Sequence, residues 1–343
     1  MKPFRALFIF IAGGVLASAQ GRSSAITPVA SAVPETHHSN FVFSLLPKSF
    51  QKKPRLEFNV ITEMTPEGRK VAPPSPGQPI YYVAQAGKFI RTGSALTDNE
   101  HAPPRADLEQ AMQRALAANG FVVGELPAHR PGLVVVFNYG SHSMDPPLPP
   151  ELADEVVTPP QTAEELLPII AHDVNLQADL IERAALIGGN AFALRLKRAL
   201  IEEVANMTTN YDMQPNGQLP VSPNPASPFQ LFLSGKDSDL VAHLVEDAFH
   251  SCYFVVASAY DYDAMSHGQK RLLWRTKMTV DASGVNMTET LAPLIASAGP
   301  YFGRDMAEAS IVEKRISREG KVEIGTATVV EDKRSEIPPP VKP

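Results

Sequence analysis

The sequence has very little cysteine and no net positive charge, and each of these absences excludes a class of protein. One cysteine among 343 residues excludes an intramolecular disulfide framework and any cysteine-based zinc cluster. Lys and Arg number 31 against 37 Asp and Glu, which gives a net charge of -6. Proteins that bind nucleic acids usually carry a strongly basic surface. We therefore expect no nucleic-acid partner.

The sequence also has no apolar run that is long enough to span a membrane, and its longest apolar segment near the start has another interpretation. The chain begins with Lys2 and Arg5, continues through the 12 apolar residues 6–17, and reaches the small-residue pattern Ala17-Ser18-Ala19. This order is typical of a secretory signal peptide that is cleaved before Gln20. A transmembrane helix needs about 20 apolar residues, and no later segment is long and apolar enough to span. We expect an exported protein, periplasmic or secreted, with no membrane span after signal cleavage.

Proline is abundant, with 32 residues or about 9% of the chain against a usual share of about 5%. Because proline lacks the N–H that helices and central strands need, long irregular connections are expected. Composition then divides the chain into a signal peptide (1–19), a mobile N-terminal arm (20–54), the first part of an α+β domain (55–139), proline-rich connections with a helical insert (140–235), the second part of that domain (236–330) and a disordered tail (331–343).

Hydrophobic periodicity predicts the elements of the α+β domain. A helix is expected from Asp107, between Pro103-Pro104 and the stop signal Asn119-Gly120. A helix over 237–251 is followed by a strand pair, and a further helix begins at Asn286 or Thr288. The predicted strands are 55–62, 80–84, 88–92, 121–126, 133–139, 252–260, 271–280 and 322–330.

The order of these elements predicts an α+β fold with a mostly antiparallel sheet and helices on one face. The periodic region 163–207 is expected to form a helical hairpin that turns at Gly188-Gly189, which makes it a helical insertion.

Alternation along residues 271–280 separates two faces of one strand. Trp274 shares its face with Met278 and Val280 and is expected to be buried. Arg275 and Lys277 share the opposite face, which is expected to be at least partly wet. These two cations are therefore candidates for binding a partner, such as an acidic component of the cell envelope, although charge is ordinary on an exposed sheet face.

Three short motifs carry a resemblance: AMxxALAANG at 111–120, LVVVFNY at 133–139 and LLWRT at 272–276. On these motifs the chain resembles small α+β domains of unknown function in bacterial envelope proteins, with the helical insert as a departure. The block YDYD…LLWRTKM…AGPYFGRDM is also similar to an uncharacterised exported bacterial family. Neither resemblance implies an activity.

The sharpest candidate metal site is one face of the helix at 237–251. His243, Asp247 and His250 share that face with Glu246, and imidazole and carboxylate groups are common ligands of divalent metals. His243 and His250 are seven positions apart, about 10 Å along a helix, so one ion would need a further ligand from another element. The alternative is the solvated polar face of an amphipathic helix.

A second candidate is the segment after residue 260, where Asp261, Asp263 and His267 carry groups suited to acid–base chemistry. Alternating Tyr and Asp at a strand end is the alternative interpretation. His142 with Asp145, and His172 with Asp173, are interpreted as chance neighbours.

Searches for a nucleophile and for a phosphate-binding loop find no match. Cys252 lies at the start of an apolar strand, where a thiol is most often buried. We therefore expect a non-catalytic binding or scaffolding protein of the cell envelope, with an unknown envelope component as partner and no cofactor. The alternative is a metal-assisted hydrolase that uses a divalent metal and the His and Asp residues between 243 and 267.

Overall fold

The computed structural model of the protein describes most of the chain between residues 47 and 318. The described ranges are 47–75, 77–93, 101–143, 173–212, 227–235 and 237–318, with the backbone alone at 86 and 207–212. The predicted signal peptide, most of the predicted arm, the predicted strand at 322–330 and the predicted tail lie outside these ranges.

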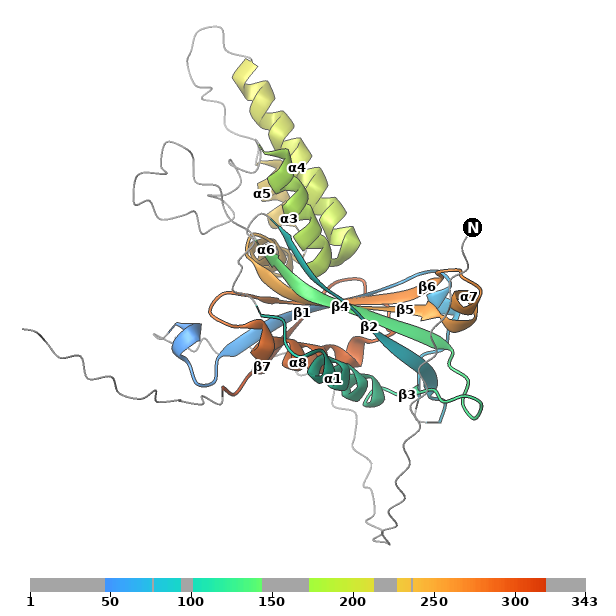
Figure 1. Ribbon diagram of the computed structural model, residues 1–343. Coiled ribbons are helices and arrows are strands. Elements are labelled where there is room, and N and C mark those ends of the chain that lie inside the picture. Colours follow the sequence, from blue (N-terminus) through green and yellow to red (C-terminus); the bar gives the residue numbers. More distant parts are fainter. Residues whose placement is uncertain are drawn as a thin grey trace, which may run out of the picture. The chain divides into compact units, whose positions relative to one another are not determined.

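One sheet forms the centre of the described structure, and its seven strands follow the order β3-β2-β4-β5-β6-β1-β7 (Figure 1). The strands are β1 (Arg55–Met64), β2 (Ile80–Gly93), β3 (Phe121–Val123), β4 (Leu133–Ser143), β5 (Cys252–Asp261), β6 (Leu272–Asp281) and β7 (Ser310–Arg315). Strand β2 runs parallel to β3 and β4, and the remaining neighbours are antiparallel. The predicted α+β class with a mostly antiparallel sheet is confirmed.

Several strands differ from the prediction: β3 is shorter and β4 is longer than expected, and two others differ in kind. The segments predicted at 80–84 and 88–92 form the single strand β2, which contains a bulge between Ala86 and Phe89. Gly87 lies so close to β4 at this bulge that a Cβ atom would stand 2.0 Å from Asn138 Oδ1. Strand β7 was not predicted, because it is a short edge strand with a graded rather than an alternating burial pattern.

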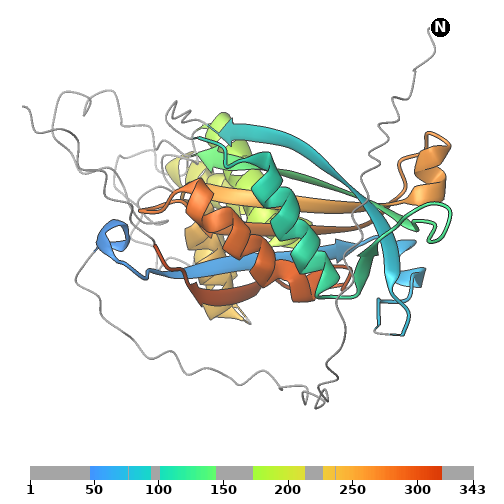
Figure 2. The same cartoon turned by 60° about the horizontal axis from the view of Figure 1, so that its bottom comes forward.

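Two helices cover one face of the sheet. Helix α1 (Arg105–Ala117) and helix α8 (Met287–Ala298) lie side by side across the strands (Figure 2). Both follow the predicted signals, and α8 starts with a capping box between Asn286 and Glu289. This face holds the larger apolar core. Trp274 is 3% exposed in that core, which confirms its predicted burial.

The second face is covered by the helical insert together with α6, which the sequence had grouped with the α+β domain (Figure 1). These helices are α3 (Val174–Ile187), α4 (Gly189–Asp212), α5 (Pro228–Leu233) and α6 (Ser238–Ala248). The predicted hairpin turn is confirmed, since α3 ends before Gly188 and α4 begins at Gly189, whose φ of 85° favours glycine. Of the helices predicted on one face, α1 and α8 lie there, whereas α6 packs with the insert on the opposite face.

This second layer has its own apolar core. Apolar side chains of α3, α4, α5 and α6 pack mainly against one another, and Ile61 of β1 is the sheet residue that joins them. Polar contacts also join the insert to the sheet, as between Asn59 of β1 and Asp247 of α6, 2.5 Å apart. No described helix combines the length and hydrophobicity needed to cross a membrane.

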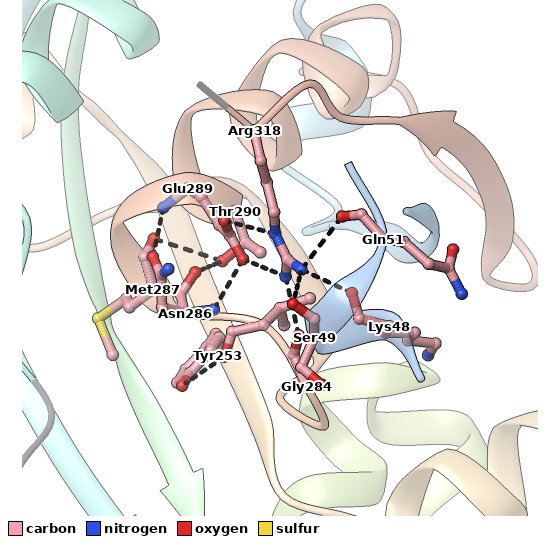
Figure 3. A network of polar contacts seen from close by, with 11 residues as sticks. Lys48, Ser49, Gln51, Tyr253, Gly284, Asn286, Met287, Glu289, Thr290 and Arg318 are labelled. Atoms are coloured by element: carbon pink, nitrogen blue, oxygen red, sulfur yellow. Dashed lines mark hydrogen bonds and ion pairs between the residues drawn. The ribbon is translucent and has the colours of Figure 1, made fainter. Parts of the chain in front are cut away.

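Arg318 fastens both ends of the described chain to α8 (Figure 3). Its guanidinium donates two hydrogen bonds to the carboxylate of Glu289, at 2.9 and 2.6 Å. Further N–H groups reach the carbonyl oxygens of Lys48 at 2.6 Å, Ser49 at 3.0 Å and Gly284 at 2.8 Å. Because this arginine is fully engaged, the cluster is structural. The short helices are η1 (Lys48–Phe50), η2 (Gly68–Lys70), α7 (Tyr262–Ser266) and η4 (Gly299–Tyr301).

Candidate functional site: a groove on the sheet

A groove of about 430 Å³ lies on the sheet face that carries the insert, and we call it the sheet groove. Alternate residues of four adjacent strands form its floor, and α3 forms one wall. Its lining residues are Ile90, Thr92, Val136, Asn138, His142, Glu182, Ala185, Leu186, Phe254, Val256, Ser258, Tyr260, Arg275 and Lys277. The volume is in the range of small-molecule pockets, about 300 to 1,000 Å³.

Strand alternation explains why this floor is apolar. In β5, Tyr253 and Val255 point into the core beneath α1 and α8, so Phe254 and Val256 face the groove. Val136 of β4 and Ile90 of β2 extend the same surface. Val256, Val136 and Ile90 are only half-buried. The groove therefore presents apolar surface to solvent that a ligand would cover.

Arg275 lies in the sheet groove, and its positive charge has few polar partners there. It is half-buried, and its Nε donates to Ser258 Oγ at 3.1 Å. Within the described ranges no carboxylate lies within 4.0 Å of its guanidinium. The predicted partner-binding residue thus lines a groove instead of lying on a flat outer face.

Lys277 corrects the prediction of a wet strand face. Its side chain is only 5% exposed, because α3 and α4 cover it. The ammonium contacts Glu63 Oε2 at 2.8 Å, the carbonyl of Ala185 at 2.8 Å and Asn190 Oδ1 at 2.9 Å. Burial lowers the pKa of Lys277 although the Glu63 carboxylate acts against it. These three acceptors match the three hydrogens of the ammonium, so Lys277 joins the insert to the sheet.

His142 occupies the far end of the sheet groove, at the end of β4. The residue is 1% exposed. Its Nδ1 lies 3.3 Å from Nη1 of Arg183, a fully buried arginine whose Nε donates to the Ala248 carbonyl at 2.6 Å. Burial, and then the charge of Arg183, lower the pKa of His142 to about 4. The imidazole is therefore neutral at pH 7.

Arg183 and the backbone of Ser143 both interact with the His142 ring, and they act in opposite directions on its pKa. The buried Nε2 has no hydrogen-bond partner in the described structure, and the closest carboxylate oxygen, Glu182 Oε2, lies 3.7 Å away. The groove therefore ends in an imidazole nitrogen beside an acidic side chain.

His142, Asp179 and Glu182 bring three possible metal-ligand atoms within 4.8 Å of one another. A histidine that binds a metal normally donates its other ring N–H to an acceptor. Here the other ring nitrogen lies 3.3 Å from the guanidinium of Arg183, which can only donate. This cationic neighbour disfavours a metal ion at Nε2.

The candidate metal ligands His243, Asp247 and His250 do not form a three-ligand cluster. His243 Nε2 lies 3.3 Å from Asp247 Oδ2, while His250 Nε2 lies 4.0 Å from Glu246 Oε1. The hydrogen bond with Asp247 raises the pKa of His243. Burial opposes ionisation of Asp247, yet bonding to His243 and Asn59 leaves its pKa lowered. In the described structure His250 is thus apart from His243 and Asp247, and the helix face is only partly solvated.

The candidate acid–base residues after β5 serve local structure. Asp261 caps α7 by accepting from the Ala264 N–H at 2.7 Å. Asp263 forms an ion pair with Arg130, and His267 Nδ1 lies 2.7 Å from the carbonyl oxygen of Asp263. The 10 residues of β5 separate this turn from His250 by about 30 Å. The two residue groups of the hydrolase alternative therefore do not share a site.

Cys252 is buried at the start of β5, and burial raises the pKa of its thiol to about 12. The thiolate that a nucleophile needs is therefore absent at neutral pH.

Sequence reasoning interpreted His142 as a chance neighbour of Asp145 and did not single out Arg183. The strand was predicted to end at Tyr139, but β4 continues to Ser143 and carries His142 onto the face of Val136. Arg183 lies on the same helical stripe as Leu180 and Ala184. A charge on an apolar stripe was the signal that could have indicated a buried, paired arginine.

No protein-family model and no curated protein matches the sequence. Among solved structures, the chain is similar to a PDZ domain protein from Parabacteroides distasonis ATCC 8503, with 10% sequence identity and a TM-score of 0.31. The similarity covers 78% of this chain and 40% of that chain, so this chain spans less than half of its neighbour's length. A likeness of this degree carries no argument about function.

Proposed function

We propose that the protein is a non-catalytic binding protein exported to the cell envelope, and that the sheet groove is its binding site. The observation that carries the proposal is a half-exposed apolar floor beside Arg275, a cation without an ion-pair partner in the described structure. Ligand sites combine such apolar surface with a few polar groups that set orientation. The predicted signal peptide supports export.

The chemistry of the groove also favours binding over catalysis. His142 is a buried imidazole whose pKa is lowered to about 4. An imidazole of such low basicity is a weak general base at neutral pH. Lys277 is fully engaged in structural contacts. The remaining groove groups can donate hydrogen bonds and hold charge, which is what recognition of a ligand needs.

A groove-filling substitution tests this proposal. The neutral dye Nile red should bind the purified full chain at one site, with fluorescence reporting the dissociation constant. Val256→Trp, in the middle of the floor, should weaken binding about tenfold or more by filling the groove. Val122→Trp, at an exposed position of edge strand β3, is the matched control and should leave binding unchanged. Circular dichroism checks that both variants fold. Unchanged dye binding in folded Val256→Trp would contradict the proposal.

A further inference from the structure

Arg275 has unused donors in a defined direction. A guanidinium carries five N–H groups, and the one on Nε is taken by Ser258. The described structure gives no other polar partner to this side chain. The terminal edge, with two coplanar N–H groups from the two Nη atoms, therefore remains available. This edge matches the two oxygens of a planar carboxylate.

The nearest acidic residue in register does not neutralise Arg275. Glu63 of β1 is the cross-strand partner of Arg275. Its carboxylate instead binds Lys277 at 2.8 Å and accepts from the backbone N–H of Asn190 at 2.7 Å. A half-buried charge without a counter-ion is unfavourable, and a ligand anion would relieve this cost. The Arg275 end of the groove therefore favours one negative charge.

The other end of the groove disfavours a second negative charge. Glu182 lines the groove near His142 with a side chain that is 68% exposed, and Asp179 lies close to it. Between the two ends the floor combines the apolar side chains of Val256 and Phe254 with the polar side chain of Asn138. Charge and polarity along the groove thus match a molecule with one anionic head and an apolar body.

The size of the groove limits the length of that body. The groove volume of about 430 Å³ lies in the range of pockets for small molecules, about 300 to 1,000 Å³. Dodecanoate, with a carboxylate head and an unbranched chain, is a small molecule of this kind.

We infer that the sheet groove binds an amphipathic monocarboxylate, with the carboxylate on the terminal N–H groups of Arg275 and the chain along the apolar floor. The inference rests on the proposed function, because it requires the groove to be a binding site. It adds the chemical class of the ligand and the residue that selects it.

Isothermal titration calorimetry of the purified full chain tests the inference, with dodecanoate, dodecanol and dodecyl phosphate below their aggregation limits. Wild type should bind dodecanoate at least about tenfold more tightly than dodecanol, because a charge-assisted hydrogen bond is lost with the alcohol. In Arg275→Gln the two affinities should become equal. Arg271→Gln removes an exposed arginine of the same hairpin and should keep the preference.

The outcomes separate the two proposals. Equal affinities for dodecanoate and dodecanol in wild type, or tighter binding of dodecyl phosphate, would overturn the carboxylate inference and leave the groove as a binding site. Binding of Nile red without binding of dodecanoate would do the same. If neither Nile red nor any alkyl probe binds, both proposals fail. Should Arg275→Gln not fold, Arg275→Lys keeps the charge but loses the two-pronged donor, and its dodecanoate affinity should fall severalfold.

Discussion

Lowering the pH should destabilise the protein through protonation of His142. The expected loss in the free energy of unfolding is large enough to measure separately from other titrating groups. The folded-state pKa of about 4 lies below the ordinary value of 6.5. Between these values the unfolded chain binds more protons than the folded chain, so stability falls as pH falls. The groups that face the ring are Arg183, Glu182 and Asp179. Protonation would put an imidazolium against a buried guanidinium, and the exposed Glu182 compensates little for this repulsion.

The linkage relation gives the size of this effect. With those two pKa values, the contribution of His142 to the free energy of unfolding falls by about 2 kcal/mol between pH 7.5 and pH 5. By pH 4 the fall reaches about 3 kcal/mol. Most of the loss therefore occurs above the range in which ordinary carboxylates titrate.

Urea unfolding followed by Trp274 fluorescence measures the effect, with wild type and His142→Asn compared at each pH. The side-chain oxygen of the introduced asparagine can still accept from Arg183. Subtracting the variant removes contributions common to both proteins, including those of the shifted pKa values of His243 and Asp247. The stability difference should shift against wild type by the amounts above. A difference that stays constant within about 0.5 kcal/mol, or a His142 resonance that titrates near pH 6.5, would refute the reasoning.

Three further outcomes are expected. Lys277→Met should lower the free energy of unfolding in urea by about 3 to 5 kcal/mol, because it leaves the Glu63 carboxylate without its cation. Adding Glu63→Gln should recover part of this loss. Additive effects of the two substitutions would contradict their coupling. Trp274→Ala should cost about 3 to 5 kcal/mol because it removes a core aromatic that stacks on Phe302, and native tryptophan emission that iodide quenches freely would argue against burial. N-terminal sequencing of protein from the periplasm should begin at Gln20, whereas an uncleaved cytoplasmic chain would exclude export.

Local signals predicted the helices on the first face well. Helix α1 starts after Pro104 and ends before Gly120, and α8 starts at the capping box of Asn286 and Glu289. Each signal acts within a few residues, so the sequence contains the whole cause. Residues 80–93 show the limit of such signals. The polar and glycine residues that suggested two strands mark a bulge, and Gly87 is explained only by Asn138 on the neighbouring strand.

The candidate site was harder to predict because its parts are far apart in the chain. Alternation placed Arg275 and Lys277 together on one strand face, and the structure keeps them there. Sequence could not indicate what covers that face, since the carbonyl of Ala185 that binds Lys277 is 92 positions away. A polar strand face is either open to water or covered by an element that supplies polar partners. Both situations give the same alternating pattern.

On strand β6 the insert covers one cation, Lys277, and leaves the other, Arg275, partly open to solvent. This difference determines where a ligand can bind. Asn190 and Glu63 satisfy Lys277 beneath the helices, so that position is closed. Two residues earlier Arg275 is beyond these partners, and Ser258 is its one hydrogen-bond partner among the described residues. An insert that covered the whole face with apolar side chains would leave Arg275 either buried without a counter-ion or excluded from the interface. The polar contact between insert and sheet therefore both anchors the helices at Lys277 and leaves a charged, accessible groove at Arg275.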